Sequence, residues 1–239
     1  MKKYCIVNTS NKQIVKKLEE YGYTCIPTEK SADVSEPISL HADVLYLKTG
    51  DKTIYVSECQ KNNIELLKQL GYTVKTVKLS PGYKTECKLN LVITDDFILC
   101  NPKTCMDISE IKGNRQVIYT NQGYTKCSTV VIGNDNFITE DEGIYHALTK
   151  AGKNCLLIEK GHVHLVGYEY GFIGGASAYL EEEKTLVVFG DIEHIFLKKI
   201  TGLCLENNIV FSHMKAEQIT DIGGAVFLGD NDLNNLGDW

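Results

Sequence analysis

One arrangement recurs along the chain and restricts its fold: two apolar strands around a polar turn, then a helix, then a third strand. It is clearest in residues 41–80, where HADVLYLKTGDKTIYVS places two strands around a Lys-Thr-Gly-Asp turn. A helix follows and ends at Gly71, before a strand over 73–79. The apolar face of this helix is formed by Ile64, Leu66, Leu67 and Leu70. The order of elements is therefore β-β-α-β.

The same order is predicted in three further segments, at about 81–122, 123–165 and 166–216. Hairpins are expected at 88–100 and 127–139, helices at 105–112, 142–150 and 193–205, and strands at 116–119, 155–158 and 209–212. A period of roughly 40 to 50 residues is typical of propellers and repeat arrays.

The two ends of the chain supply the halves of a fifth unit. Residues 219–230 open another module, and residues 4–28 have the pattern strand, helix, strand. Shared termini favour a closed ring over an open stack, which would need capping repeats. We therefore predict a single α/β domain over 1–239, a five-bladed propeller with pseudo-fivefold symmetry. Its fifth module is 217–239 plus 1–40, and a generic α/β sandwich is the alternative.

The composition excludes several classes of function. The net charge of −6 argues against a nucleic-acid surface, because neutralising phosphates requires a basic face. No window holds the run of about 18 apolar residues that a transmembrane helix needs, so we expect no membrane contact. The N-terminus turns polar too early for a signal peptide. Nine cysteines without a C-x-x-C pair indicate free thiols in a reducing, cytoplasmic setting.

The glycine-rich segment GFIGGAS, residues 171–177, raises the question of phosphate binding. Its spacing matches neither G-x-G-x-x-G nor G-x-x-x-x-G-K-[ST], and two short strands follow it where a helix would be needed. We therefore predict no nucleotide cofactor. His162 and His164 alternate like two metal ligands on one strand, but no third ligand is near them in the sequence, so no metal is predicted either.

Five β-β-α-β modules about one axis are the architecture of the pentein superfamily, which this sequence resembles along its full length. GYTKCS (123–128), GFIGGAS and DIGG (221–224) resemble segments of an uncharacterised clostridial-type branch of that superfamily. The superfamily includes the guanidino-modifying hydrolases and amidinotransferases. The resemblance implies that the first strand of each module lines a central channel.

Aligning these first strands predicts a polar collar around the channel. His41, Lys88 and Cys127 take one equivalent position, and Asp43, Asn90 and Thr129 take the position two residues later. The fourth module offers Gly175 and Ser177, and the fifth offers Asp221 and Gly223. Because side chains two residues apart share a strand face, we expect both positions to point inward. The glycines would allow a close backbone approach to a ligand or a positive φ.

The resemblance also implies roles for these residues. His41-Ala42-Asp43 resembles the H-x-D element of the guanidino-modifying enzymes, in which histidine is a general acid/base and the carboxylate holds the cation. Cys127, the only cysteine in the collar, would be the nucleophile that forms a thiouronium; a buried core thiol is the alternative. The expected ligand-binding residues are Asp43, Lys88, Asn90, Thr129, Gly175, Ser177 and Asp221. A capping role for Asp221 and an ion pair for Lys88 are the alternatives.

One departure from that family leaves two functions open. The guanidino-modifying enzymes place the cysteine in their last module, but Asp221–Leu228 contains none. The first hypothesis is an enzyme acting on a guanidino, amidine or cationic amine metabolite. The second is a non-catalytic pentein that binds a small molecule or a protein partner. The sequence is compatible with a homo-oligomer, and the segment 168–172 is expected to be an aromatic flap or an ordinary connection.

Overall fold

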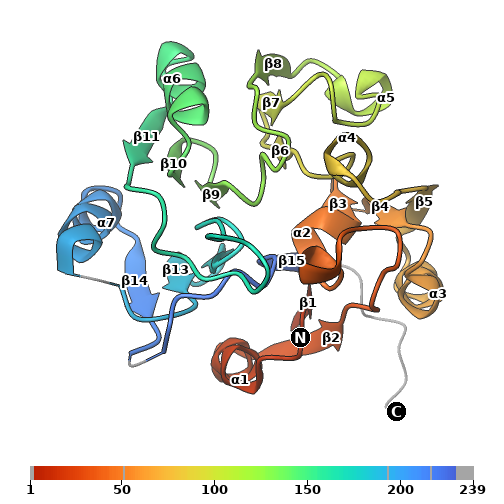
Figure 1. Ribbon diagram of the computed structural model, residues 1–239, viewed down its shortest axis with the longest axis horizontal. Coiled ribbons are helices and arrows are strands. Elements are labelled where there is room, and N and C mark those ends of the chain that lie inside the picture. Colours follow the sequence, from red (N-terminus) through yellow and green to blue (C-terminus); the bar gives the residue numbers. More distant parts are fainter. Residues whose placement is uncertain (1–2, 51, 193, 216, 230–239) are drawn as a thin grey trace.

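The strands of the protein form five separate three-stranded sheets. The structure is a computed structural model, and it describes residues 3–50, 52–192, 194–215 and 217–229. Each sheet contains one antiparallel and one parallel pair of strands. Figure 1 shows the sheets arranged around the middle of the molecule, with most helices outside them. No sheet in the described part closes on itself, so the fold is an α/β arrangement of five small mixed sheets.

The elements follow the predicted order in each sheet. The first module consists of α2 (Ala42–Leu45), β3 (Tyr46–Lys48), β4 (Thr53–Ser57), α3 (Lys61–Gln69) and β5 (Thr73–Val77), and its three strands form the first sheet. The second module consists of α4 (Tyr83–Glu86), β6 (Val92–Ile93), β7 (Phe97–Cys100), α5 (Ser109–Lys112) and β8 (Gln116–Tyr119). The third module consists of β9 (Thr129–Ile132), β10 (Asn136–Thr139), α6 (Glu142–Lys150) and β11 (Asn154–Leu157). The fourth module consists of β12 (Ser177–Leu180), β13 (Thr185–Val188), α7 (His194–Glu206) and β14 (Val210–His213).

The fifth sheet joins the two ends of the chain, as predicted. It consists of β15 (Ala225–Leu228), β1 (Lys3–Val7) and β2 (Tyr23–Pro27), with α1 (Lys12–Glu20) between the last two strands. A short 3-10 helix, Glu36–Ile38, follows. The centre of the sheet is β1, where Cys5 lies opposite Phe227 on one side and Cys25 on the other. Residues 230–239, which we assigned to this module, lie outside the described residues.

Apolar periodicity and capping explain where the long helices form. In α6 the Asp141 side chain accepts a hydrogen bond from the Ile144 backbone N–H at 2.8 Å, and Ile144 and Leu148 are buried. In α3 the buried side chains include Ile64 and Leu67, as the sequence indicates. Each of these helices connects a parallel pair of strands, which cannot be joined by a tight turn.

The starts of the modules differ from the prediction. His41 is the residue before α2 and is not part of a strand, because its carbonyl oxygen accepts hydrogen bonds from the backbone N–H groups of Val44 and Leu45 at 3.2 and 3.1 Å. Residues 88–91 likewise precede the two-residue strand β6. Thr129 and Ser177 begin the strands β9 and β12, but the other predicted collar residues precede the first strands, so the prediction that strand alternation directs them inward was wrong. The helix expected over 105–112 is limited to α5.

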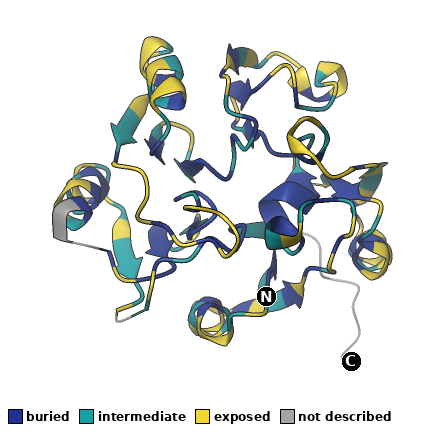
Figure 2. Cartoon of the chain, in the orientation of Figure 1, coloured by how far each residue is buried: buried dark blue, intermediate teal, exposed yellow. Residues whose placement is uncertain are grey.

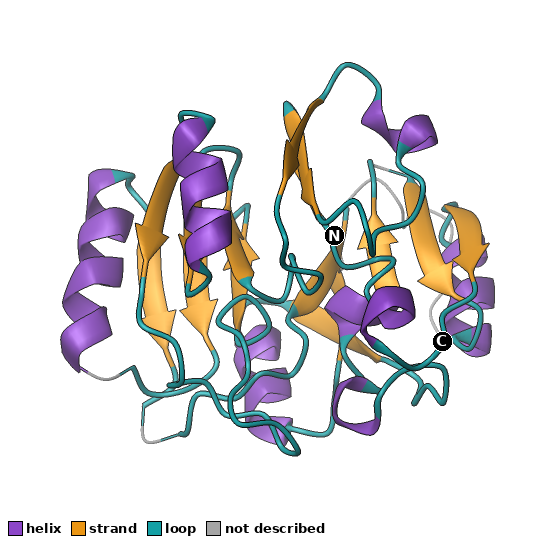
Figure 3. Cartoon of the chain, turned by 45° about the horizontal axis from the view of Figure 1, so that its top comes forward, coloured by secondary structure: helices purple, strands orange, loops and turns teal. Residues whose placement is uncertain are grey.

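Burial is concentrated toward the middle of the molecule. Figure 2 shows buried residues on the strands and exposed residues on the outer faces of the helices. Figure 3 shows that loops connect one sheet to the next. Several polar side chains are buried among the apolar ones near the middle, and these include His41, Asp43, Asn90 and Asp221. No helix among the described residues is long and apolar enough to cross a membrane.

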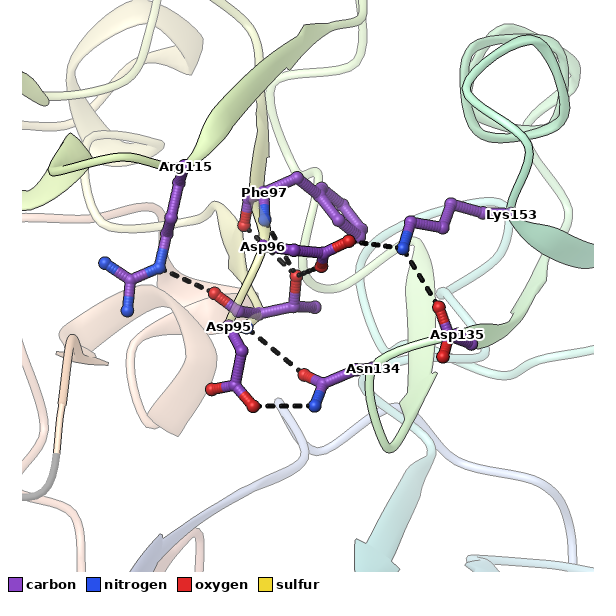
Figure 4. A network of polar contacts seen from close by, with 8 residues as sticks. Asp95, Asp96, Phe97, Arg115, Asn134, Asp135 and Lys153 are labelled. Carbon is purple, nitrogen blue, oxygen red and sulfur yellow. Dashed lines mark hydrogen bonds and ion pairs between the residues drawn. The ribbon is translucent and has the colours of Figure 1, made fainter.

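Polar contacts between the hairpin turns fasten the second sheet to the third (Figure 4). Asn134 and Asp95 exchange two hydrogen bonds, at 2.7 and 3.2 Å. The Lys153 ammonium contacts the carboxylates of Asp96 and Asp135 at 2.5 and 2.9 Å and lies 5.2 Å from the centre of the Phe97 ring. One lysine therefore connects the two turns and covers a core aromatic ring.

We predict that Lys153→Ala lowers the free energy of unfolding by about 1 kcal/mol, because it removes partly screened ion pairs and a cation–π contact. Chemical denaturation measures the change. Lys150→Ala, at the exposed end of the preceding helix α6, is the matched control and should change stability less. Equal effects of the two substitutions would contradict the role given to Lys153.

Candidate active site in the central turns

The turns that precede the first strands bring His41, Cys127 and Asp221 to one cavity of about 270 Å³. The cavity is otherwise lined mainly by apolar and aromatic side chains, among them Tyr124, Tyr170 and Phe172. All three polar residues are almost completely buried. A small apolar cavity with few convergent polar groups is the usual form of a small-molecule site.

Asp221 is held by backbone groups and faces His41. Its carboxylate accepts hydrogen bonds from the backbone N–H groups of Phe172 at 2.9 Å and Gly223 at 3.0 Å. The Oδ1 atom lies 3.6 Å from Nδ1 of His41, so the pair becomes an ion pair when the imidazole is protonated. Burial raises the pKa of Asp221, and the His41 ring opposes that shift. Among the described residues, Nδ1 of His41 has no hydrogen-bond partner.

Cys127 is positioned by Asn90. The Asn90 amide nitrogen lies 2.9 Å from Sγ of Cys127 and donates to the Asp43 carbonyl oxygen at 2.9 Å. The amide oxygen accepts hydrogen bonds from the backbone N–H groups of Lys126 and Cys127. Burial raises the pKa of the Cys127 thiol well above its usual range, and the carboxylates of Asp43 and Asp221 raise it further. The thiol is therefore protonated at neutral pH in the free protein.

Asp43 separates this cavity from a second one. Its carboxylate lies within 4.8 Å of a ring nitrogen of His41 and of Sγ of Cys127. It lines a cavity of about 190 Å³, together with Lys126 and residues of the first strands. No described residue donates a hydrogen bond of normal geometry to either oxygen of Asp43. Burial lowers the pKa of Lys126, and Asp43 opposes that shift. Lys126 and Cys127 thus face different cavities although they are adjacent in the chain.

The set His41, Asp43 and Cys127 can also serve as metal ligands. One ligand atom from each residue lies within 4.8 Å of the others. A nitrogen, a carboxylate oxygen and a thiolate are a donor set that suits zinc. The prediction that the site holds no metal therefore stays a prediction.

The other predicted ligand-binding residues are distributed more widely. Lys88 lies away from this group, since its ammonium donates to the Lys78 carbonyl oxygen at 2.8 Å on the exposed side of the chain. The buried Thr129 hydroxyl donates to the Thr125 carbonyl oxygen at 2.7 Å. Ser177 lines a third cavity, on the side where Lys126 lies. The structure thus gathers His41, Asp43, Asn90, Cys127 and Asp221, and it does not bring Lys88 to them.

The glycines of GFIGGAS are required by packing against the site. A Cβ atom on Gly175 would lie 2.0 Å from Oδ1 of Asp221. On Gly174 it would lie 2.5 Å from the carbonyl oxygens of Lys126 and Cys127. The Gly175 backbone N–H donates to the Cys127 carbonyl oxygen at 3.0 Å. The segment therefore packs on the turn that carries Cys127, and its glycines make room for Asp221.

Two buried carboxylates near the site were not predicted. Glu140 accepts hydrogen bonds from the Ile173 backbone N–H at 3.0 and 3.2 Å, and burial raises its pKa well above the usual range. Glu86 accepts hydrogen bonds from Ser35 and Tyr124. Burial acts to raise the pKa of Glu86, but these hydrogen bonds lower it overall. The partners are 33 to 51 residues away in the chain, so no local pattern marks either residue.

Solved structures of two enzymes show the same fold. DDAH from Pseudomonas aeruginosa, in a complex with citrulline, is 11% identical, with 95% of this chain and 99% of that chain covered and a TM-score of 0.58. Agmatine deiminase from C. jejuni is 10% identical, with 90% and 88% covered and a TM-score of 0.55. The fold of this protein is therefore that of the pentein superfamily.

The chain belongs to DUF6873, a family of unknown function, whose model matches residues 5–226. A comparison with curated proteins found no match. Because the identity to the two enzymes is low, they show the fold of this chain and leave its chemistry to be argued from the site.

We predict that Gly175→Ala lowers the free energy of unfolding by about 1–3 kcal/mol, because the added methyl group displaces the buried Asp221 carboxylate. Gly202→Ala, in helix α7 where an added Cβ meets nothing within 4 Å, is the matched control and should be neutral or stabilising. Chemical denaturation of both variants tests the assignment. A Gly175→Ala variant as stable as the control would refute the packing role of this glycine.

Proposed function

We propose that the protein is a cysteine-dependent enzyme that acts on a guanidino or amidino cation, as a hydrolase or an amidinotransferase. The observation that carries the proposal is the grouping of the Cys127 thiol, the His41 imidazole and the carboxylates of Asp43 and Asp221 in one buried region. Nucleophile, general acid/base and cation anchors are the groups that this chemistry needs.

The charge of the site favours a cationic substrate. Asp43 and Asp221 are both buried beside His41. Lys126, which lines the smaller cavity with Asp43, is the other basic group next to Asp43, and burial disfavours its charged form. The carboxylate of Asp43 accepts no hydrogen bond of normal geometry from a described residue, and the Cys127 thiol lies within 4.8 Å of it. A planar cation that presents several N–H groups can satisfy carboxylates in this way. A buried carboxylate without a partner is costly, and a bound cation removes that cost.

The reaction divides into two steps at the central carbon of the cation. In the first, the Cys127 proton passes to His41 while Sγ bonds to that carbon. An amine then leaves with the proton that His41 holds, and a thiouronium on Cys127 remains. In the second, water adds to the carbon while His41 takes one of its protons. The C–S bond then breaks, the thiol regains that proton from the imidazolium, and the remaining hydroxyl proton passes to the released amine, which leaves a ureido product. An amine in place of water would give the transferase.

The raised pKa of Cys127 suits this sequence of events. Burial is the main cause of the raised pKa of Cys127, and the carboxylates of Asp43 and Asp221, which raise it further, are the groups that a substrate cation would neutralise. Binding therefore lowers the cost of forming the thiolate, and the nucleophile is generated where the substrate is present.

A non-catalytic role is the second candidate. The protonated state of Cys127 in the free protein and the absence of a cysteine from residues 221–228 favour a binding protein. We further propose that the five modules form one closed domain over residues 1–239, with the site on its axis. Five equivalent turns directed at one point support this arrangement.

We predict turnover of guanidino or amidino compounds, measured as release of ammonia or an amine together with a ureido product. Cys127→Ser and His41→Gln should each lower kcat by about 100-fold or more, because they remove the nucleophile and the proton carrier. Cys155→Ser, in strand β11, is the matched thiol control and should retain activity. Turnover that survives in Cys127→Ser would exclude the mechanism.

We predict that Asp43→Asn moves the alkylation of Cys127 to lower pH. Burial is the main cause of the raised thiol pKa and the Asp43 charge raises it further, so removing that charge favours the thiolate and shifts the midpoint of the alkylation rate to lower pH. Peptide mass spectrometry after iodoacetamide treatment follows Cys127 among the nine cysteines. Asp107→Asn, an equal change of charge at an exposed loop, should leave the midpoint in place. An unchanged or higher midpoint in Asp43→Asn would contradict the electrostatic account.

A further inference from the structure

A larger cavity lies beside the candidate site and has no role in the mechanism above. Its volume is about 700 Å³, and it lies between the first turn of α6, the end of β11, helix α7 and the loop that carries Tyr170 and Phe172. In Figure 1 this loop runs from β11 toward the middle of the molecule, between α6 and α7 on one side and the central turns on the other. The volume is in the range of small-molecule sites.

The two cavities share one wall. Tyr170 and Phe172 line both the 270 Å³ cavity and the 700 Å³ cavity. The wall is held from both sides by buried carboxylates, because Asp221 accepts the Phe172 N–H and Glu140 accepts the Ile173 N–H. A ligand anchored at Cys127 that extends past these two rings would enter the second cavity.

The inner surface of the larger cavity suits a cation. Its inner polar groups include the carboxylates of Glu140 and Asp141, beside the two aromatic rings. At the exposed rim, Lys160 and Lys199 are balanced by Glu142 and Glu159. Carboxylates combined with aromatic faces are the surroundings that bind ammonium groups.

The surroundings of Glu140 indicate an excess of negative charge on this wall. Burial is the main reason that its pKa is raised, and the neighbouring carboxylates of Asp221 and Asp141 raise it further. A cation in the larger cavity would offset the carboxylates of Glu140 and Asp141, which line it.

We propose that this cavity binds a second, ammonium end of the substrate, so that the substrate is a guanidino or amidino compound with two positive groups. The inference rests on the proposed function, since it takes the first cation to lie at Cys127. The positions of the basic residues also favour an ammonium group over a carboxylate at this end of the substrate. The single arginine of the chain, Arg115, donates to the carbonyl oxygens of Thr94 and Ile111 in the second sheet. A carboxylate would thus meet only the rim lysines.

The test compares three four-carbon guanidines that differ at the far end: an ammonium, a hydroxyl, and an α-amino acid. Calorimetry on the full chain with Cys127→Ser, which prevents turnover, gives each Kd. We expect the ammonium compound to bind about tenfold more tightly than the hydroxyl compound, as for a charge-assisted hydrogen bond. Tightest binding of the amino acid, or equal binding of ammonium and hydroxyl, would overturn the inference.

The substitution Glu140→Gln then tests whether the Glu140 carboxylate binds the ammonium group of the ligand. The amide oxygen still accepts the Ile173 N–H, so the loop is retained, but the charge is lost. We expect the ammonium preference to fall to about twofold or less, with the Kd of the hydroxyl compound unchanged. Glu65→Gln, an equal charge change on the exposed face of α3, is the matched control and should keep the preference. An unchanged preference in Glu140→Gln would contradict the assignment.

Two further measurements separate a failed inference from a failed fold or a failed function. Tyr170→Leu leaves Glu140 in place and removes one ring, and it should lower the ammonium preference by about threefold; no change would count against the cavity. If none of the guanidines binds and 1,4-diaminobutane binds with a Kd that depends on Glu140, the proposed function fails while the ammonium site stands. If 1,4-diaminobutane does not bind either, the ammonium site fails as well.

Discussion

The structure around the central turns depends on one buried carboxylate, that of Asp221. Burying a charged carboxylate is unfavourable unless hydrogen bonds or an opposite charge compensate it. Asp221 receives two backbone hydrogen bonds, from Phe172 and Gly223, and it faces His41. It is also the reason that position 175 has no side chain. The fourth module, the fifth module and the turn before α2 therefore meet at this group.

Other buried polar groups of the site lack the hydrogen bonds that would compensate their burial. The carboxylate of Asp43 and Nδ1 of His41 are buried without hydrogen-bond partners among the described residues, and burial and the nearby carboxylates keep the Cys127 thiol protonated. Such groups lower stability, and they concentrate where a ligand supplies the missing partner. Glu86, by contrast, is a buried carboxylate near the site whose two oxygens are both hydrogen-bonded.

The modules were predictable where local signals agree. The helix over 142–150 and the strand over 116–119 have the predicted bounds, because periodicity and capping decide both locally. The beginning of each module was not predictable in the same way. The Asp43 backbone N–H donates to the Gly223 carbonyl oxygen, 180 residues away, and this contact helps replace a strand with α2. Glu140 was missed for the same reason, since its partner is in another module.

The grouping of Cys127 with His41 shows that this fold brings together residues that are far apart in the chain. The two residues belong to the third and first modules, and yet their reactive atoms lie within 4.8 Å. Each module directs the turn before its first strand toward the same place, so a side chain in any module can reach the others. The number of residues that separate a side chain from His41 in the chain therefore does not indicate whether the two can come into contact. The absence of a cysteine from residues 221–228 therefore does not decide whether the site has a nucleophile, because the geometry that a nucleophile needs is available from the third module as well.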